Sequence, residues 1–333
     1  MIALDANGAD RGPAAVAEGA RMSGLPVTLY GPAADLSGAP GEVVDAPVFV
    51  TNDEDPAIAV RSKEDASIVL AARAVREGRA DALVSFGSTG AALAASLFHI
   101  KRMNGVRRPA VAALLPVPGR ELLLLDAGAN VEVRAEELVQ FAYMGSVYME
   151  AVHGVERPAV GLLSNGEEAK KGTEPVVEAH ERLSEGGTGL NFVGNFEGTD
   201  LVDSPVDVLV TDGFTGNVAL KVLEGTAKVV GGAVRDAIMS DPISKLGGLL
   251  VRRKLARLSR TFSAEHVGGA VLLGLRGVVV VGHGSSSPET IATALHLARR
   301  AADERMVERT AAALEAGGAL RSAPAGSFAG GDD

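Results

Sequence analysis

The segment from Gly166 to Gly172 carries two carboxylates and two ammonium groups in a turn between an apolar run and a helical pattern. A lysine held in such a turn can neutralise a phosphate group or protonate a leaving group, with a pKa lowered by neighbouring cations or by burial. Gly166, Glu167 and Lys171 are therefore candidate site residues. A solvated charged loop fits the same spacing, so the turn alone leaves both interpretations open.

A second turn, from Asp212 to Asn217, also closes an apolar run and opens a helical pattern. The Asn217 amide can donate a hydrogen bond to a developing oxyanion, which stabilises the transition state of acyl transfer. Asn217 can equally cap the helix that follows, and the residues alone favour the cap. Asp212 and Gly216 would then line the same site as substrate-binding residues.

Glycines and hydroxyl side chains mark further turns that suit an anion. Such turns bring bare backbone N–H groups, and the positive end of a helix dipole, close to a negatively charged ligand. Plain helix caps, and a histidine satisfied by backbone bonds, are the alternatives for these sequences. The candidate binding residues in the turns are Asp5, Gly8, Gly87, Ser88, Thr89, Gly90, Asn130, His283, Gly284 and Ser285.

Most of these turns follow apolar runs that are typical of buried strands. In open α/β sheets, ligands bind at the carboxyl ends of the strands. We therefore expect the turns, together with another at residues 193–195, to form one composite site for an anion.

Strand-like and helical patterns alternate along almost the whole chain. Short, nearly continuous apolar runs are typical of strands buried on both faces, so the alternation predicts an α/β fold, a mostly parallel sheet with helices on both faces. We expect a single catalytic domain over residues 1–321 and a disordered tail over 322–333. The predicted strands cover 2–4, 27–30, 82–85, 111–115, 122–125, 160–163, 192–193, 206–210 and 278–281, and the predicted helices 13–22, 67–77, 90–103, 136–153, 174–184, 217–239 and 288–316.

Residues 240–265 interrupt this alternation with a basic amphipathic helical element. Val251 and Leu255 step along one face, while Arg253 and Arg257 step along another. Such a helix can dock on the protein core or on a partner subunit, or it can rest on anionic lipid. The pattern gives the two interpretations equal weight.

Composition narrows the classes of function. A net charge of −10 argues against a general nucleic-acid binder, and the absence of Cys excludes disulfides, a thiolate nucleophile and cysteine metal sites. No secretory signal and no apolar run of about 18–20 residues is present, so we expect a cytoplasmic location. The common nucleotide-loop, serine-hydrolase and zinc-protease motifs are missing, and no clustered aspartates indicate a metal site.

Ten segments, in order along nearly the whole chain, resemble the bacterial phosphate acyltransferase (PlsX) family. They include Val84 to Ala91, Leu124 to Asn130, Gly166 to Gly172 and Asp212 to Lys221. The resemblance implies conversion of fatty acyl carrier protein and inorganic phosphate to acyl phosphate and free carrier protein, in phospholipid synthesis. It also implies a homodimer with an isopropylmalate-dehydrogenase-like fold related to phosphotransacetylases, no organic cofactor, and peripheral contact with the anionic inner face of the cell membrane.

By position, the same resemblance assigns catalysis to Lys171 and Asn217, and it chooses Lys171 over the adjacent Lys170. The chain has no cysteine and no activated serine motif, so we predict direct acyl transfer to phosphate without an acyl-enzyme. Three alternatives remain: an acyl-CoA phosphotransacetylase, an NAD-dependent dehydrogenase of the same fold, and a non-enzymatic adaptor for carrier protein or membrane.

A partner as acidic as acyl carrier protein requires a local basic patch on this acidic chain. Two clusters of cations meet that requirement, and each is a candidate for contact with carrier protein or membrane. The residues concerned are Arg107 and Arg108 in the first cluster and Arg252, Arg253 and Arg257 in the second.

Overall fold

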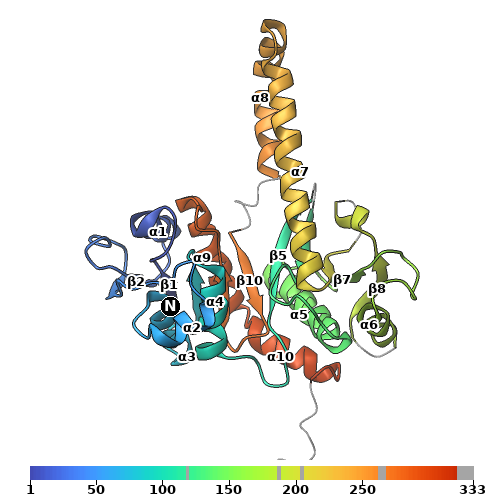
Figure 1. Ribbon diagram of the computed structural model, residues 1–333, viewed down its shortest axis with the longest axis horizontal. Coiled ribbons are helices and arrows are strands. Elements are labelled where there is room, and N and C mark those ends of the chain that lie inside the picture. Colours follow the sequence, from blue (N-terminus) through green and yellow to red (C-terminus); the bar gives the residue numbers. More distant parts are fainter. Residues whose placement is uncertain (118–119, 186–188, 203–205, 262–267, 321–333) are drawn as a thin grey trace, which may run out of the picture.

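The computed structural model describes residues 1–117, 120–185, 189–202, 206–261 and 268–320, without the side chains of Pro116 and of residues 255–261. The tail predicted at 322–333 lies outside the described residues. The α/β class is confirmed, because one sheet runs through the described chain and helices cover both of its faces (Figure 1).

Eleven strands of the described chain form this sheet, in the order β3-β2-β1-β4-β11-β10-β5-β6-β9-β7-β8. Their bounds are β1 Ile2–Asp5, β2 Val27–Gly31, β3 Glu42–Asp45, β4 Ala82–Ser85, β5 Ala110–Val117, β6 Arg120–Leu125, β7 Ala159–Leu163, β8 Asn191–Phe196, β9 Val208–Val210, β10 Ala270–Leu273 and β11 Val278–Val281.

Two blocks of parallel strands make up the sheet. β3, β2, β1, β4 and β11 form the first block, and β6, β9, β7 and β8 form the second. β10 and β5 join them by antiparallel pairing, with Val271 opposite Val280 and Ala112 opposite Leu125. The strands of the second block therefore run opposite to those of the first, and the sheet is mostly rather than wholly parallel.

The helices of the described chain pack mostly on either side of the sheet. Their bounds are α1 Gly12–Ser23, α2 Pro56–Ser62, α3 Ser67–Arg76, α4 Thr89–Ala95, α5 Ala135–His153, α6 Glu174–Ser184, α7 Gly213–Met239, α8 Pro242–Thr261, α9 Pro288–Asp303 and α10 Met306–Ala316, with a π-helical turn η1 at Ser96–Ile100 and a 3-10 turn η2 at Gly198–Leu201.

Alternation along the strands explains why they read as continuous apolar runs. Ile2 and Leu4 of β1 lie in a core with α1, α5 and α9, whereas Ala3 lies in the opposite core with α2, α3 and α4. In the second block, Leu123 joins the first of these cores and Leu124 joins a third, which packs against the start of α7. Apolar residues are needed at every position because both faces are covered.

Three predictions about the elements need correction. The predicted helix 288–316 is two helices, because Arg305 adopts a left-handed conformation with φ 52° between α9 and α10. The helix predicted to start at Asn217 begins four residues earlier, at Gly213. Strands β3 and β10 and helix α2 were not predicted. β10 has only four residues, too few to show a periodic pattern in the sequence.

The turn predicted at 193–195 is instead part of strand β8. The pairing register shifts here, since Phe192 is opposite Val160 and Gly194 is opposite Gly161, which leaves Val193 as an extra residue. Gly194 has φ 108°, a conformation that glycine adopts without strain. The segment is therefore a β-bulge, which re-aims the side chains that follow it.

The predicted basic element forms helix α8, which returns beside α7 to make a helical hairpin that projects from the body of the protein (Figure 1). Large apolar side chains of the hairpin are exposed, among them Ile243 at 84% and Leu250 at 81%. Among the described residues, no helix combines the length and apolar character needed to cross a bilayer.

Candidate functional site

The buried carboxylate of Asp126, directly after β6, organises the first loop of the site. Its Oδ1 accepts hydrogen bonds from the backbone N–H groups of Val111, Gly128 and Ala129, at 2.9, 3.0 and 3.0 Å. Its Oδ2 accepts from both the backbone and the side-chain N–H of Asn130, each at 2.8 Å. Sequence reasoning missed Asp126 as a site residue, although an Asp between a buried strand and a glycine turn is a usable signal.

Asn130 is brought into the site, but its amide is already occupied. One amide hydrogen is donated to Asp126 and the other to the backbone carbonyl of Pro109, both at 2.8 Å. The side chain is buried. Both amide hydrogens therefore hold the loop after β6 against the start of β5, and neither is left to bind a ligand.

The loop after β9 packs directly on the Asp126 loop through two glycines. A Cβ on Gly216 would lie 1.9 Å from the carbonyl oxygen of Asp126, and one on Gly213 would lie 2.7 Å from its carboxylate. The Gly213 N–H also donates to the Asn130 carbonyl at 2.7 Å. Only glycine permits this approach, so Gly216 acts by fitting two loops together.

Asp212, rather than Asn217, caps helix α7. The Asp212 carboxylate accepts from the backbone N–H of Thr215 at 2.8 Å and from its hydroxyl at 2.7 Å. The capping interpretation of Asn217 is thus wrong, because the helix begins earlier than predicted. Asn217 lies one turn inside the helix, exposed, with its side chain 3.7–3.9 Å from the Cβ position of Gly128. Its amide remains available to a ligand beside the glycine turn.

The loop after β7 carries Lys171 on an exposed turn. The Lys171 N–H donates to the carbonyl of Glu168 at 2.9 Å. The aliphatic part of Lys171 lies against Gly166, where an added Cβ would be 2.7 Å from Lys171 Cγ. Gly172 closes the turn with φ 109°. Glu167 is exposed in the same turn.

Strand pairing places these loops at one edge of the second block. Val210 of β9 is opposite both Leu125 of β6 and Leu162 of β7, and all three strands are parallel. The loops that carry Asn217 and Lys171 therefore leave the sheet on the same side and follow neighbouring strands.

The loops of the first block form a second group, centred on Asp5. The buried Asp5 carboxylate accepts a hydrogen bond from the hydroxyl of Ser85 at 2.7 Å. The same hydroxyl accepts from the Gly87 N–H at 3.3 Å. Gly8, with φ 82°, would place a Cβ 3.5 Å from Gly87 Cα. Asp5, Gly8 and Gly87 are therefore brought together as expected, with Asp5 in an organising position.

Ser88 is the N-cap of the short helix α4, as its side chain accepts from the Ala91 N–H at 3.5 Å. Thr89 is the first residue of that helix. Gly90 is required by close packing, because a Cβ there would lie 2.8 Å from Pro56 Cγ. In the structure this turn is therefore a helix cap, which was the alternative to an anion-binding turn.

His283, Gly284 and Ser285 follow β11 and join the Asp5 group. The Nδ1 atom of His283 accepts from the hydroxyl of Ser285 at 2.8 Å and from its backbone N–H at 3.3 Å. The Gly284 carbonyl accepts from the backbone N–H of Asp10 at 3.0 Å. His283 is therefore satisfied locally at Nδ1 while its ring stays exposed.

Burial raises the pKa of Asp5 to about 6 from an ordinary value of 3.8, and the hydrogen bond from Ser85 opposes this in part. Between these two pH values the folded chain holds a proton that the unfolded chain has released. The contribution of Asp5 to stability is therefore complete below the unfolded pKa and is lost as the pH rises through about 6.

We predict that Asp5→Asn, which is neutral at every pH, lacks this loss. Relative to the unsubstituted chain, its free energy of unfolding should rise by up to about 3 kcal/mol between pH 4 and pH 7. Urea unfolding across that range measures the difference. Asp35→Asn, at an exposed carboxylate, serves as the control with a flat difference, and an equally flat difference for Asp5→Asn would refute the assignment.

The candidate residues thus fall into two groups. The first group contains Asp5, Gly8, the turn 87–90 and the turn 283–285. The second group consists of the loops after β6, β7 and β9. Among the described residues, no hydrogen bond or ion pair connects the first group to the second. Where one composite site was expected, the described residues form two separate sets of loops, each held together by its own hydrogen bonds.

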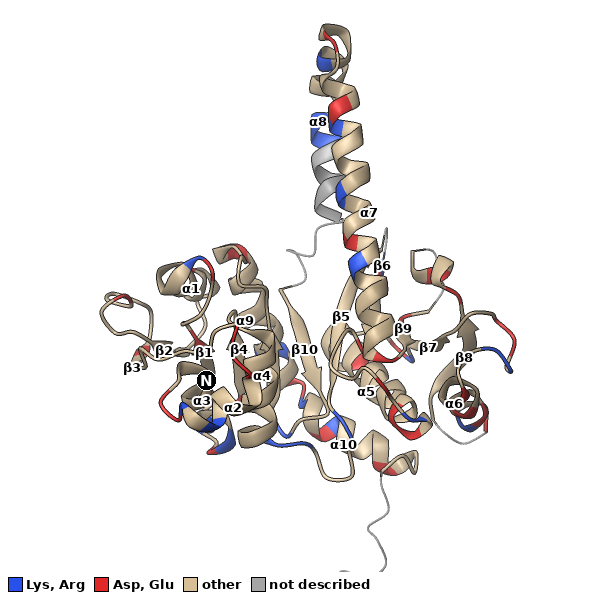
Figure 2. Cartoon of the chain, viewed as in Figure 1, with Lys and Arg blue, Asp and Glu red and all other residues tan. Residues whose placement is uncertain are grey.

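The two clusters of cations differ in their surroundings. Arg107 lies 3.7 Å from Glu136 and Arg108 lies 3.3 Å from Glu137, so both are paired with the start of α5. Arg252 and Arg253 are exposed on α8 of the helical hairpin (Figure 2). The side chain of Arg257 lies outside the described residues.

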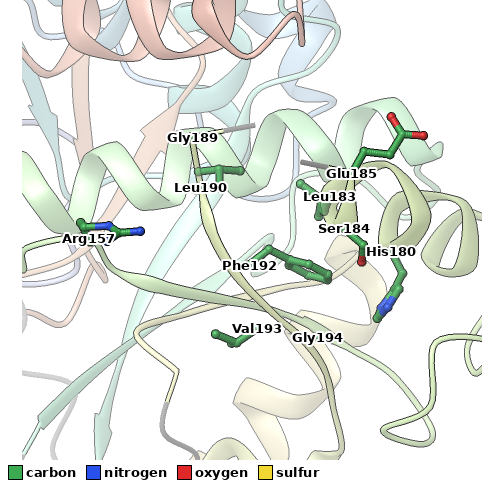
Figure 3. Close-up of a pocket in the computed structure, with 10 residues that line it drawn as sticks. All are labelled: Arg157, His180, Leu183, Ser184, Glu185, Gly189, Leu190, Phe192, Val193 and Gly194. Atoms are coloured by element: carbon green, nitrogen blue, oxygen red, sulfur yellow. The ribbon is translucent and has the colours of Figure 1, made fainter. Parts of the chain in front are cut away.

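A cavity of about 640 Å³ lies beside the second block, between α6 and the edge strand β8 (Figure 3). Leu183, Leu190 and Phe192 give it apolar walls, and Arg157 and His180 contribute polar groups. Sequence reasoning did not find this cavity, because its walls come from separate segments: Arg157 before β7, the end of α6 and the start of β8.

Comparisons with known proteins agree on one family. A family model described as "Fatty acid synthesis protein" matches residues 1–309. A phosphate acyltransferase of Lacticaseibacillus casei is 44% identical over 302 residues, covering 87% of this chain and 88% of that protein. Another, from Anaeromyxobacter sp., is 43% identical over 338 residues, covering 98% and 94%.

Solved structures share the fold at low sequence identity. A phosphotransacetylase from Staphylococcus aureus superimposes with a TM-score of 0.60 at 16% identity, covering 91% of this chain and 94% of that one. A 4-hydroxythreonine-4-phosphate dehydrogenase from Klebsiella pneumoniae gives a TM-score of 0.51 at 15% identity, covering 91% and 98%. The arrangement of strands and helices is therefore one that several enzyme classes use.

Proposed function

This chain belongs to the family of fatty acid synthesis proteins that includes the phosphate acyltransferases, and from that premise we propose that its loops transfer a fatty acyl group from acyl carrier protein to inorganic phosphate. It is a phosphate acyltransferase of phospholipid synthesis. The observation that carries the conclusion is 43% identity to a phosphate acyltransferase across 98% of the chain. The continuous sheet supports a single catalytic domain over residues 1–321.

The reaction needs little covalent help from the protein. A phosphate oxygen attacks the thioester carbonyl carbon, the carbon–sulfur bond breaks, and the proton of hydrogen phosphate ends on the departing thiol. Inorganic phosphate is largely dianionic near neutral pH, so it can attack without a strong protein base. The protein has to hold the phosphate, stabilise the oxyanion and assist departure of the thiolate.

Lys171 and Asn217 are suited to the last two tasks. The Asn217 amide is exposed beside Gly128 and would donate to the developing oxyanion. The Lys171 ammonium would neutralise phosphate and pass a proton to the departing thiolate, and the lysine would regain its proton from the hydrogen phosphate that attacks. Support for their cooperation comes from the pairing of β7 with β9, from whose ends their loops leave the sheet on one side.

The loops of the first block would supply the phosphate cradle. The turns around Gly87 and Gly284 are held by the Ser85 hydroxyl, which Asp5 fixes, and by the backbone of Asp10, and their remaining backbone N–H groups would face the phosphate, while the Gly87 N–H itself donates to Ser85. Oriented backbone dipoles of this kind favour an anion. The two sets of loops leave strands of opposite direction, so in this proposal they would meet across the joining strands β10 and β5 to hold one phosphate and one thioester.

The helical hairpin would supply the surfaces for larger partners. Exposed cations of α8 suit both acidic carrier protein and anionic lipid, and exposed Ile243, Leu246 and Leu250 would enter a bilayer surface. Exposed Val218, Val222 and Val229 make a stripe along α7 that a second subunit would cover in a homodimer. Arg107 and Arg108 are weaker docking candidates because both are paired with α5.

A comparison of acyl donors tests this function. With phosphate present, long-chain acyl carrier protein should give acyl phosphate at a kcat/KM at least about 100-fold above that for acetyl-CoA, because carrier protein adds docking contacts that the small donor lacks. Thioester loss and acyl phosphate are measured together. A preference for acetyl-CoA would identify a phosphotransacetylase, and thioester loss without phosphate would identify a hydrolase.

A further inference from the structure

A buried amide links the Lys171 loop to the rigid part of the second block. Asn195 of β8 is only 4% exposed. Its Nδ2 donates to the backbone carbonyl of Glu168 at 3.0 Å, and its Oδ1 accepts from Nδ1 of His180 at 3.0 Å. The amide thus uses one end to hold the loop and the other to hold helix α6.

The Glu168 carbonyl is the point where this link meets Lys171. The same oxygen accepts from the backbone N–H of Lys171 at 2.9 Å, which closes the turn. The loop side chains around it are exposed, from Glu167 to Thr173. Asn195 is therefore the buried polar side chain that fixes an otherwise solvent-facing turn, and a fixed turn sets where the Lys171 stem begins.

The other end of the link is held firmly. The His180 ring packs edge-on against Phe192, with ring centroids 5.2 Å apart and an interplanar angle of 79°. His180 and Phe192 both line the cavity beside β8 (Figure 3). The bulge at Gly194 leaves Val193 46% exposed and turns Asn195 inward. One helix and one strand thus determine the position of the amide.

We propose that Asn195, oriented by His180, is a positioning residue for Lys171. The inference rests on the catalytic role proposed above for Lys171. The Asn195 amide holds the Glu168 carbonyl, this carbonyl holds the Lys171 turn, and the ammonium is thereby kept where the thiolate leaves. Loss of this restraint lets a flexible side chain sample unproductive positions, which lowers the rate of the chemical step rather than substrate binding.

Asn195→Asp tests the link with the least change in shape. The carboxylate can keep the contact with His180 but cannot donate to the Glu168 carbonyl. We expect kcat to fall about ten-fold, with both Michaelis constants unchanged within about two-fold. Asn191→Asp is the matched control, because Asn191 lies on the same strand and its amide donates to the Arg157 carbonyl at 3.1 Å. This control should retain full kcat.

His180→Ala provides a second variant if Asn195→Asp does not fold, since His180 is only partly buried. It should lower kcat in the same sense by releasing the other end of the amide. An unchanged kcat in a folded Asn195→Asp protein, or equal losses in Asn195→Asp and Asn191→Asp, would overturn the proposal.

A double-mutant cycle separates positioning from a general structural role. If Asn195 acts through Lys171, then Asn195→Asp should cause no further loss of kcat in a Lys171→Met background. A further ten-fold loss there would show that Asn195 supports the site by another route, and the inference would fail while the function stands. Full activity of Lys171→Met alone would instead remove the catalytic role of Lys171.

Discussion

Lys171→Met should lower kcat by about 10²–10⁴-fold, the range expected for loss of positioned proton transfer and of a charge beside the leaving group. Methionine keeps much of the stem that packs on Gly166 and removes only the ammonium. Because the side chain is exposed, the free energy of unfolding should change by less than about 0.5 kcal/mol. Steady-state kinetics with acyl carrier protein and phosphate, together with thermal unfolding, measure both effects.

Lys170→Met is the matched control for this prediction. Lys170 is the preceding residue, it is also exposed, and it carries the same charge on the same turn. Its substitution should leave kcat within about two-fold, because a solvent-facing charge contributes little. Comparable losses in the two variants would show that the turn contributes only its general positive charge, and a loss confined to Lys170→Met would reverse the assignment.

Asn217→Ala should lower kcat by about 10²–10³-fold, which is the usual effect of removing one oxyanion donor. The Michaelis constant for phosphate should stay unchanged, because the amide interacts with the carbonyl oxygen only as charge develops on it. Helix α7 should remain intact, since Asp212 and not Asn217 caps it. Circular dichroism checks the helix, and initial rates check the donor.

Thr226→Ala, at an exposed position further along α7, controls for the effect of any alanine in this helix. It should leave the rate unchanged. If Asn217→Ala also retained activity within about three-fold, Asn217 would not be the oxyanion donor, and the backbone N–H groups of the glycine turns would have to serve instead.

The sequence predicted two kinds of element: strands that are apolar along their whole length, because both faces of the sheet are covered, and helices whose apolar residues recur at helical spacing. Strands β1, β4 and β11 are short, mostly apolar runs with every residue buried, and helices α6 and α9 repeat their buried apolar positions at helical spacing. It did not predict the antiparallel β10, because four residues between glycine-containing turns carry no signal of direction. Direction is decided by tertiary pairing, which the local sequence does not encode.

The candidate site was predictable in its turns but less so in the roles of individual residues. Both Asp212 and Asn217 are good caps, and two glycines between them hide the true start of α7. Asn130 resembles a ligand-binding residue in a glycine turn, yet both of its side-chain amide hydrogens are donated within the protein, to Pro109 and to Asp126. The turn 193–195 was expected in the site, but the role of Asn195 was not predictable, because its partners Glu168 and His180 lie 27 and 15 residues away along the chain.

Direct transfer of the acyl group to phosphate is the central claim, and intact-mass spectrometry of the enzyme tests it most directly. The protein is incubated with long-chain acyl carrier protein, first without phosphate and then with it. We predict an unmodified enzyme mass throughout, a stable thioester in the first step, and acyl phosphate equal to the thioester lost in the second. An enzyme that gains the mass of the acyl group before phosphate is added, and loses it afterwards, would contradict the account.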